Sequence, residues 1–361
     1  MIEKIINEKT FRFDTFFHLL LYNCNLKPNN NNLEFISKLK QNYMNKYDIA
    51  AIGELNVDLI LNKIEGFPEM GKEKFAGDML LTLGSSTAIF AANASSLGSS
   101  VCFVGMVGKD SFGELVKNSL QEKGVSTEFL IERADTATGA TIVMSYAEDR
   151  ANVTYQGAMD IMGLDDIDAT VFDRVRHIHL SSLFMQSALL RDVERLLEVA
   201  TSKGITISLD TQWDPAEEWR LNYEKVLPMI NIFLPNEKEL QALTATSSLE
   251  EAIERVVPFL GEAMVVKMGS KGSLLVRKDG SRHLLPSFLN RNVVDAIGAG
   301  DSFNSGFVSA YVKGLELEKC QEIGNMTGAL TTTAAGGTGA FTSPEEIERR
   351  SQALFGRSLG L

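Results

Sequence analysis

Short apolar runs alternate with amphipathic helical segments along most of this chain, and that alternation restricts the folds open to it. The runs are typical of buried strands, and they lie at residues 47–53, 101–107, 177–180, 206–209, 230–234 and 264–267. Residues 189–200 represent the segments between them, with apolar side chains at helical spacing. Strands that alternate with helices form mostly parallel sheets covered on both faces. The sequence therefore predicts an α/β fold whose ligands bind at the carboxyl ends of the strands.

The first 46 residues differ from the rest of the chain. They contain a phenylalanine cluster within residues 11–17 and an asparagine run at residues 29–32, a composition that favours loop or disorder. Met44 lies just before the first predicted strand. We interpret residues 1–46 as an N-terminal extension, which is either an accessory segment, disordered on its own, or the product of a misplaced start codon.

The bulk composition is typical of a soluble globular protein. The 361 residues are 44% hydrophobic and 23% charged, with a formal net charge of −12. An acidic surface repels phosphate backbones, so nucleic acid is not an expected partner. No apolar run approaches the ~20 residues of a membrane span, and no secretion signal is recognisable. Cys24, Cys102 and Cys320 are far apart, without disulfide or metal spacing, so we expect a cytoplasmic protein.

Residues 293–307 (VVDAIGAGDSFNSGF) carry the clearest chemical signal. Gly298, Ala299 and Gly300 follow an apolar strand end and precede Asp301 and an apolar helical run. Small residues at a strand-to-helix turn expose backbone N–H groups, and the new helix adds its positive end, so the turn can hold an anion. Asp301 at its mouth can accept a proton from an attacking hydroxyl. The alternative interpretation is a tight turn with Asp301 as a helix N-cap.

This segment resembles the C-terminal motif of the ribokinase-like (PfkB-type) carbohydrate kinase family. The chain lacks a Walker A motif and a GxGxxG motif, so phosphate must be held in another way. It departs from the family pattern at Ala296, where threonine is usual, and it matches at Asp295, Gly298, Ala299, Gly300, Asp301, Phe303 and Gly306. Residues 53–58, 84–110, 236–239 and 267–272 resemble further family motifs in the family's order.

The resemblance implies a fold, a reaction and its cofactors. The implied fold is a ribokinase-like three-layer α/β/α sandwich over residues 47–361, with a mostly parallel central sheet. A small β-sheet lid would be drawn from about residues 55–85 and 136–158, including a hairpin of residues 140–146 and 153–155. The implied activity is transfer of a phosphoryl group from ATP, with Mg²⁺, to a hydroxyl of a small sugar or sugar derivative. Relatives of this family also suggest a homodimer that forms through the lids.

The resemblance also assigns roles to residues on the phosphate side. Asp301 would be the catalytic base, and the backbone N–H groups of Gly298, Ala299, Gly300 and Asp301 would hold the transferred phosphoryl. Glu239 would act on Mg²⁺ through water, and Asp295 is a candidate K⁺ ligand or a structural cap of the turn. Asn236 and Glu239 also have the spacing of a helix capping box. The residues that would bind ATP are Asn236, Lys267, Gly269, Ser270, Gly272 and Asn325.

The substrate side is implied by residues near the chain's first strand. Asn56 and Asp58 lie two apart on a strand and face one side, where an amide and a carboxylate suit sugar hydroxyls. Gly84 and Ser85 would also bind substrate. The family usually has a second glycine at position 85 and often an asparagine at position 89, where this chain has Ile89. The sugar and the hydroxyl therefore stay open.

Two alternative functions remain at this stage. A nucleoside kinase of the same family would need an aromatic or apolar platform, for which Phe90, Phe184 and Met185 are candidates. A sugar-sensing protein without activity would lack the base or the anion hole.

The roles of some single residues also stay open. Gln212 and Asp214 either reach the substrate or cap a loop. His177 and His179 alternate on an apolar strand, where we expect hydrogen-bonded core histidines rather than metal ligands.

Overall fold

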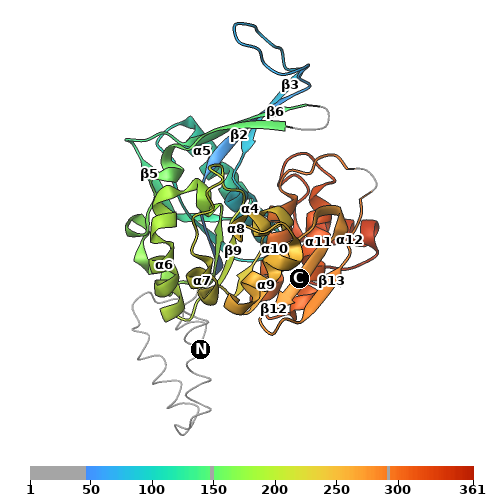
Figure 1. Cartoon of the computed structure of the whole chain (residues 1–361). Helices are drawn as coiled ribbons and strands as arrows, with labels where there is room; N and C mark the ends of the chain where they lie inside the picture. The colour runs from blue at the N-terminus through green and yellow to red at the C-terminus, as the bar shows by residue number, and fades with distance from the viewer. Residues whose placement is uncertain (1–45, 147–149, 291–292) are drawn as a thin grey trace, which may run out of the picture. The chain divides into compact units, whose positions relative to one another are not determined.

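The short apolar runs pair into one large sheet, sheet A (Figure 1). A computed structural model describes residues 46–146, 150–290 and 293–361 of the chain. Within these residues sheet A has the strand order β13-β12-β11-β10-β9-β8-β1-β4-β5. All pairings from β5 to β11 are parallel, whereas β12 is antiparallel to both of its neighbours. The strands are β1 (Tyr47–Ile52), β4 (Val101–Gly108), β5 (Ser126–Arg133), β8 (Val175–Ser181), β9 (Thr206–Asp210), β10 (Ile232–Phe233), β11 (Ala263–Lys267), β12 (Ser273–Arg277) and β13 (Arg282–Leu285).

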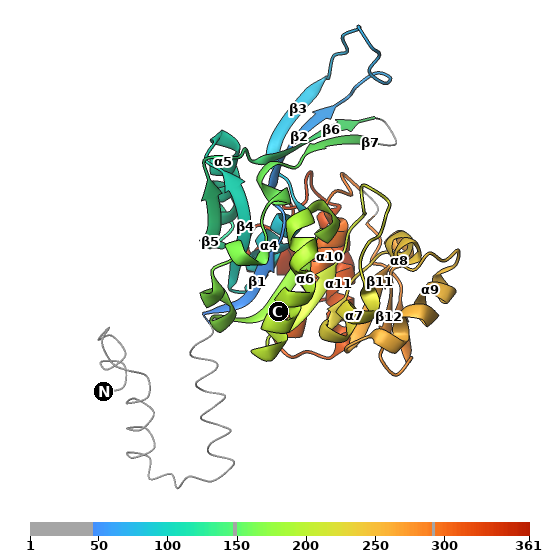
Figure 2. The ribbon, with the colours of Figure 1, turned by 60° about the vertical axis from the view of Figure 1, so that its left-hand side comes forward.

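Helices cover both faces of sheet A, which makes the predicted three-layer α/β/α sandwich (Figure 2). One face carries α6 (Ser187–Ser202), α7 (Tyr223–Val226), α8 (Glu237–Leu243) and α9 (Leu249–Val256). The other face carries α4 (Ser86–Ser96), α5 (Ser111–Glu122), α10 (Ala299–Val312), α11 (Leu317–Thr331) and α12 (Pro344–Phe355). In β1, Ala50 and Ile52 belong to the first core, and Ile49 and Ala51 belong to the second. Both faces of the strand are buried, which explains its apolar run from Ile49 to Ile52.

The predicted strands are confirmed, with one difference in length. The run at residues 230–234 contributes only Ile232–Phe233 to the sheet. Asn231 turns its side chain to the neighbouring strand instead, where Oδ1 accepts a hydrogen bond of 2.8 Å from the Ile207 amide. The antiparallel edge, β12 and β13, has no counterpart in the sequence prediction because these strands lack a helix between them.

A second sheet, sheet B, has the strand order β3-β2-β6-β7. Its strands are β2 (Asn56–Asn62), β3 (Asp78–Leu83), β6 (Gly139–Ser145) and β7 (Arg150–Tyr155), which lie inside the two segments predicted to form a lid. The turn predicted between β6 and β7 falls largely on residues 147–149, outside the described residues. Sheet B stands beyond the carboxyl ends of the sheet A strands (Figure 2). The extension predicted for residues 1–46 also lies outside the description, except for Lys46.

The strand histidines have the buried, hydrogen-bonded environment that the sequence predicts. His177 Nε2 and His179 Nδ1 each lie 2.8 Å from the Ser208 hydroxyl, on the neighbouring strand β9. Burial lowers the pKa of both imidazoles to about 3, so both are neutral at physiological pH. The described residues hold no group of three or more His, Cys, Asp or Glu that could bind a metal ion. None of the helices in the described ranges is long and apolar enough to cross a membrane.

Candidate active site

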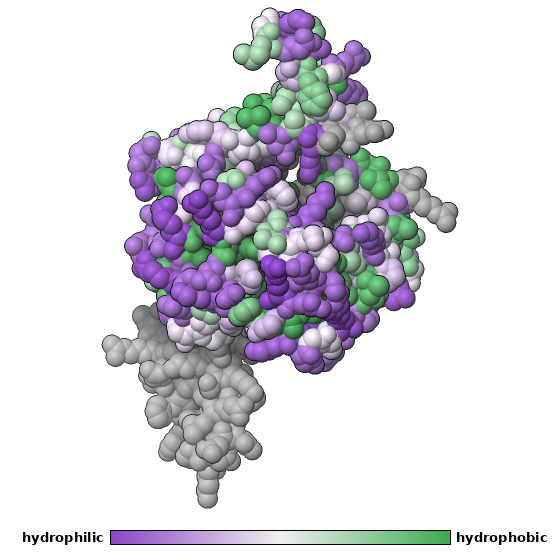
Figure 3. All heavy atoms as spheres, in the orientation of Figure 1, coloured by the Kyte–Doolittle hydropathy of each residue, from purple (hydrophilic) through white to green (hydrophobic). Residues whose placement is uncertain are grey.

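A cleft of about 1370 Å³ opens where the strands of sheet A end. Its lining includes residues that follow the parallel strands within three positions: Glu54 after β1, Ser182 after β8, Gln212 after β9, Asn236 after β10 and Gly269 after β11. One face of sheet B supplies the lining on the opposite side. Figure 3 shows the molecular surface hollowed between sheet B and the rest of the domain. The cleft therefore lies at the carboxyl ends of the strands, where the sequence predicts that ligands bind.

The turn before α10 presents free backbone amides to this cleft. Gly298 is the helix N-cap, in the left-handed region with φ of 72°, and a Cβ there would lie 2.6 Å from the Gly337 Cα. Among the described residues, the amides of Gly298, Gly300 and Asp301 donate no hydrogen bond, whereas that of Ala299 makes a long one of 3.3 Å to Ala296. These amides and the helix N-terminus suit an anion. Because Gly298 is the N-cap, the alternative interpretation of Asp301 as the cap is wrong.

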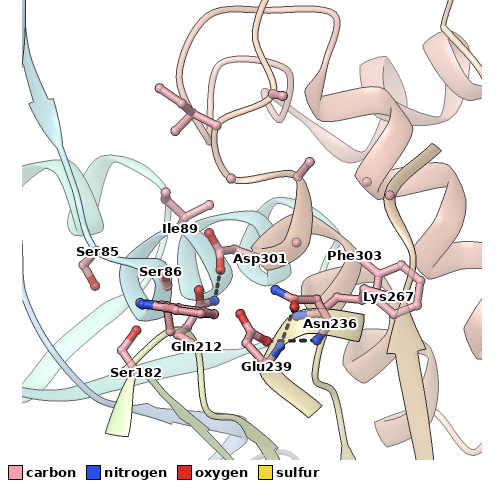
Figure 4. Close-up of a pocket in the computed structure, with 18 of the residues that line it drawn as sticks. Ser85, Ser86, Ile89, Ser182, Gln212, Asn236, Glu239, Lys267, Asp301 and Phe303 are labelled. Carbon is pink, nitrogen blue, oxygen red and sulfur yellow. Dashed lines mark hydrogen bonds between the residues drawn. The ribbon is translucent and has the colours of Figure 1, made fainter. Parts of the chain in front are cut away.

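The Asp301 carboxyl lies in a group of buried charges (Figure 4). Gln212 Nε2 donates to Asp301 Oδ1 at 2.9 Å and lies 3.1 Å from Oδ2 of Asp210, the last residue of β9. Asp210 also accepts from Lys267 Nζ and from Asn304 Nδ2, each at 2.5 Å. Burial, and then the negative charge of Asp210, raise the pKa of Asp301 to about 8. A carboxyl with a pKa near neutrality suits general base catalysis.

Lys267 brings a positive charge to the amide turn. Its ammonium pairs with Asp210, and a Cβ added at Gly300 would lie 3.7 Å from Nζ. The side chain is 12% exposed and that of Asp210 is fully buried. Lys267 lines the cleft together with the other residues predicted to bind ATP, which are Asn236, Gly269, Ser270, Gly272 and Asn325. The structure therefore brings this predicted set together beside the amide turn.

Gly269 and Gly272, which follow β11, are each required to be glycine for a different structural reason. Gly269 has a φ of 57° and no neighbouring atom that a Cβ would meet, so its freedom serves the turn itself. Gly272 has a φ of 104°, and a Cβ there would lie 2.0 Å from the Leu285 carbonyl oxygen. The glycine at 272 is thus required by packing against the chain that leaves β13, and not only by a nucleotide.

Asn236 and Glu239 form the capping box that their spacing predicts. Asn236 Oδ1 accepts from the Glu239 amide, and Glu239 Oε2 accepts from the Asn236 amide, both at 2.9 Å (Figure 4). Glu239 is nevertheless buried against the cleft, where desolvation and then the charge of Asp210 raise its pKa to about 7. A buried carboxylate that lines a phosphate site is a chemically suitable partner for hydrated Mg²⁺. The structural interpretation and the metal interpretation are compatible.

The Asp295 carboxylate links the turn before α10 to the loop that contains Gly336. Oδ1 accepts from the Ile297 amide and Oδ2 accepts from the Gly336 amide, both at 2.9 Å. Both carboxylate oxygens therefore serve the structural role that the sequence left as an alternative. Each oxygen keeps a second lone pair, so a K⁺ role for Asp295 stays a prediction.

The predicted substrate residues meet on the inner face of sheet B. Asn56 Nδ2 donates to Asp58 Oδ1 and lies within hydrogen-bond distance of the Thr141 hydroxyl, both at 2.9 Å. Burial raises the pKa of Asp58 to about 6. A Cβ at Gly84 would lie 2.3 Å from Asp58 Oδ1, so only glycine leaves this pair intact. Ser85 lines the cleft and also caps α4, since its hydroxyl accepts from the Ala88 amide at 3.0 Å.

An aromatic wall borders the substrate side of the cleft, and we define it as Phe184, Trp213 and Trp219. Trp219 packs edge-on against both partners, with ring centroids 5.3 Å from Phe184 and 5.0 Å from Trp213. Phe184, Met185 and Trp213 line the cleft. Gln156, just after β7, donates to the Met185 carbonyl at 3.1 Å, which ties this wall to sheet B. Of the residues that the sequence offered as a platform, Phe184 and Met185 therefore line the cleft.

Contacts in the structure bear on two further candidates from the sequence, Phe90 and Asp214. Phe90 is fully buried and stacks on His179 at a centroid distance of 3.7 Å, so its prediction as a platform is wrong. Asp214 has the loop-cap role that the sequence offered as one alternative, because its carboxylate accepts from the amides of Ala216, Glu218 and Trp219, and it also lines the cleft.

Sequence reasoning missed residues whose role depends on partners far along the chain. Asp210 and Asn304 join the charge cluster, Glu54 is buried beside the substrate residues, and Thr141 and Arg150 line the cleft from sheet B. Asp210 carried a usable signal, since a carboxylate at the carboxyl end of a parallel strand faces the ligand edge. The others lack any local signal.

Comparisons with known proteins agree with this architecture. Residues 46–344 match the family model described as pfkB family carbohydrate kinase. An uncharacterised sugar kinase of Archaeoglobus fulgidus is 32% identical over 237 residues, 65% of this chain and 92% of that protein. Ribokinase of Haemophilus influenzae is 26% identical over 306 residues, 82% of this chain and 96% of that protein.

A solved structure supports the same fold. Arabidopsis thaliana ribokinase complexed with ribose and ATP superposes with a TM-score of 0.73 at 22% identity, covering 85% of this chain and 99% of that one. At that identity the likeness concerns the fold, and the family rests on the sequence matches. The chain therefore belongs to the pfkB family of carbohydrate kinases.

Proposed function

We propose that this carbohydrate kinase uses Asp301 as the general base for phosphoryl transfer from ATP to a hydroxyl of a small sugar or sugar derivative. One observation carries the proposal: a buried carboxyl with a raised pKa lies beside three amides without acceptors in the described structure, at the start of α10. The hydroxyl would lose its proton to Asp301 as its oxygen attacks the γ-phosphorus in line, and the bond from that phosphorus to the β–γ bridging oxygen would break to release ADP. The amides of residues 298–301 would hold the transferred phosphoryl as its charge shifts.

The nucleotide would lie along the turns that follow β10 and β11. Asn236, Lys267, Gly269, Ser270, Gly272 and Asn325 all line the cleft next to the amide turn. Glu239 would hold Mg²⁺ through water, with Asn236 beside it, because Mg²⁺ keeps several waters and takes few protein ligands. When bound, Mg²⁺ would supply positive charge that offsets the negative charge of the phosphates.

The substrate would bind under sheet B, which we propose as the lid of the kinase domain, residues 47–361. Asn56, Asp58 and Ser85 line this side of the cleft with polar groups that suit sugar hydroxyls, and Gly84 packs against the Asp58 carboxyl behind them. A lid excludes water, which protects ATP from hydrolysis. Residues 1–46 would be an extension outside this domain.

A nucleoside kinase is the second candidate, and the aromatic wall favours it. Trp213 is 44% exposed although it lines the cleft, and Phe184 lies beside it across Trp219. Flat apolar rings at a binding site stack on planar groups such as nucleobases. A sugar would contact only the polar face of sheet B, whereas a nucleoside would contact both that polar face and the aromatic wall.

The test is ATP-to-ADP conversion by the purified chain against free sugars, sugar phosphates and nucleosides, with Mg²⁺ and with or without K⁺. We expect turnover with at least one sugar-class acceptor and none after Mg²⁺ is chelated. Preference for nucleosides over the matching free sugars would put the second candidate first. K⁺-stimulated turnover would support the role of Asp295. ATP binding without turnover on any acceptor would contradict the proposed reaction.

The outer face of sheet B points to a homodimer, which we propose as the working assembly. Alternate residues of its strands face away from the cleft, and they are apolar, including Leu59, Met79, Leu81, Ile142 and Val153. Met79 is 64% exposed and Val153 is 60% exposed. Hydrophobic residues gather on sheet B in the surface view (Figure 3). An exposed apolar sheet face of this kind marks an interaction site, and a second copy offers a matching face.

Charges introduced on this face should separate the protomers. Ile142 and Val153 are cross-strand neighbours on the outer face, so Ile142→Lys with Val153→Lys places two adjacent charges on that face. We expect light scattering after gel filtration to give twice 39.7 kDa for the parent and 39.7 kDa for the variant. Leu354→Lys, on exposed helix α12, is the control and should keep the dimer. A monomeric parent, or a variant that remains dimeric, would contradict the assembly.

A further inference from the structure

Gln212 has a backbone conformation that its residue type does not favour. It follows β9 by two residues and has a φ of 58°, in the left-handed region. A side chain other than glycine there is strained, and such residues gather at functional sites. The conformation places the Gln212 amide nitrogen 3.2 Å from Asp210 Oδ1, and its side chain then turns back across the cleft. Figure 4 shows this side chain reaching toward Asp301.

The side-chain amide of Gln212 bridges two carboxyl groups. Nε2 lies 2.9 Å from Asp301 Oδ1 and 3.1 Å from Asp210 Oδ2. An ionised carboxylate only accepts hydrogen bonds, and an amide NH₂ has two hydrogens. The two acceptors therefore use both hydrogens, and the neighbouring carboxylates assign the nitrogen, rather than the oxygen, to this side.

Of the two carboxyl groups that Gln212 bridges, that of Asp210 has other partners that fix it, whereas that of Asp301 keeps one oxygen available. Asp210 is fully buried and is held by Lys267 and Asn304, each at 2.5 Å, so it is a fixed support. Asp301 Oδ1 is bound to Gln212, but no hydrogen bond between described residues reaches Asp301 Oδ2. Gln212 thereby sets the plane of the carboxyl and leaves one oxygen for another partner.

We propose that Gln212 is a positioning residue for the base, holding Asp301 Oδ1 so that Oδ2 meets the acceptor hydroxyl. This inference rests on the proposed role of Asp301. Since the amide donates to the ionised form of Asp301, it also opposes the carboxylates that disfavour ionisation. The charged groups that act on Asp301 are Asp210 on β9, Glu239 on α8, Glu54 after β1 and Lys267 on β11. Of these four groups, only Lys267 favours ionisation of Asp301. The hydrogen bond from Gln212 therefore adds stabilisation of the ionised carboxylate to that of Lys267.

Two substitutions of Gln212 distinguish the effect of its side-chain amide from the effect of its strained backbone. Gln212→Asn keeps an amide on a residue type that tolerates positive φ, but the shorter side chain cannot span both carboxyls. Gln212→Met keeps the length and removes the donor. For both we expect kcat to fall about 10- to 100-fold, the KM for ATP to stay unchanged, and the acid limb of the pH–rate profile to move up by about one unit.

One control variant and two possible outcomes make the test decisive. Gln352→Asn on α12 is the matched control and should leave kcat and the pH profile unchanged, with a melting temperature like that of the Gln212 variants. If a folded Gln212 variant keeps the parent's kcat and acid limb while Asp301→Asn is inactive, the positioning role is wrong and the base assignment stands. If Asp301→Asn keeps the parent's turnover, the base assignment fails and the positioning role fails with it.

Discussion

Replacing Asp301 with asparagine is expected to lower kcat by at least about 100-fold while ATP still binds. The substitution keeps the shape of the side chain, and the asparagine carbonyl oxygen can still accept from Gln212. It removes only the ability to take a proton from the acceptor hydroxyl. The measurement is steady-state turnover with the best acceptor from the substrate panel, together with nucleotide titration by calorimetry.

The pH dependence gives the same prediction a second readout. A base must be deprotonated to act, and burial with the charge of Asp210 raises the pKa of Asp301 to about 8. In the parent, kcat/KM should therefore rise with pH up to about 8 and then level off. The residual rate of Asp301→Asn should lack this limb. Asp279→Asn, on a turn after β12, is the matched control. Near-normal turnover in Asp301→Asn would exclude Asp301 as the base.

Replacing Lys267 with methionine is expected to destabilise the fold by about 3–5 kcal/mol, the cost of leaving one partner of a buried ion pair uncompensated. Asp210 has a fully buried side chain, and its oxygen lies 2.5 Å from the Lys267 ammonium. Without that ammonium, Asp210, Glu239 and Asp301 would share the site without a compensating cation among the groups that act on Asp301. Urea unfolding monitored by circular dichroism measures the loss.

Two controls identify the ion pair as the cause. Lys271→Met breaks an exposed pair with Glu237, in which the lysine side chain is 70% exposed, and should cost less than about 1 kcal/mol. Asp210→Asn combined with Lys267→Met removes both charges and should recover much of the lost stability, although not the activity. If Lys267→Met alone is as stable as Lys271→Met, the ion pair between Lys267 and Asp210 does not stabilise the domain.

Local patterns in the sequence were sufficient for the architecture and for part of the site. The apolar run of β1 faces two cores, so its lack of polar alternation already indicated a strand covered on both sides. The turn from Gly298 to Asp301 was recognisable because its glycines and its acid are adjacent in the chain. Asn236 and Glu239 were recognisable as a capping box for the same reason. Each of these features is encoded within a few residues.

The remainder of the site depends on contacts between distant segments. Phe90 was a plausible platform by type, but helix α4 turns it into the core against His179. Gln212 and Asp301 are 89 positions apart, and Lys267 and Asp210 are 57 apart, so no spacing predicts that their side chains meet. They meet because parallel strands bring their carboxyl ends to one edge, whatever the length of chain between them.

The sequence by itself determined the class of fold, the position of the cleft and the turn that faces it, because periodicity and turn chemistry act between near neighbours. Only the tertiary structure decided the ionisation environment of Asp301, the partner of Lys267 and which aromatic side chains reach the cleft. Burial and charge pairing are sums over everything that packs around a group, and in this chain those neighbours come from β9, β11, α8 and α10.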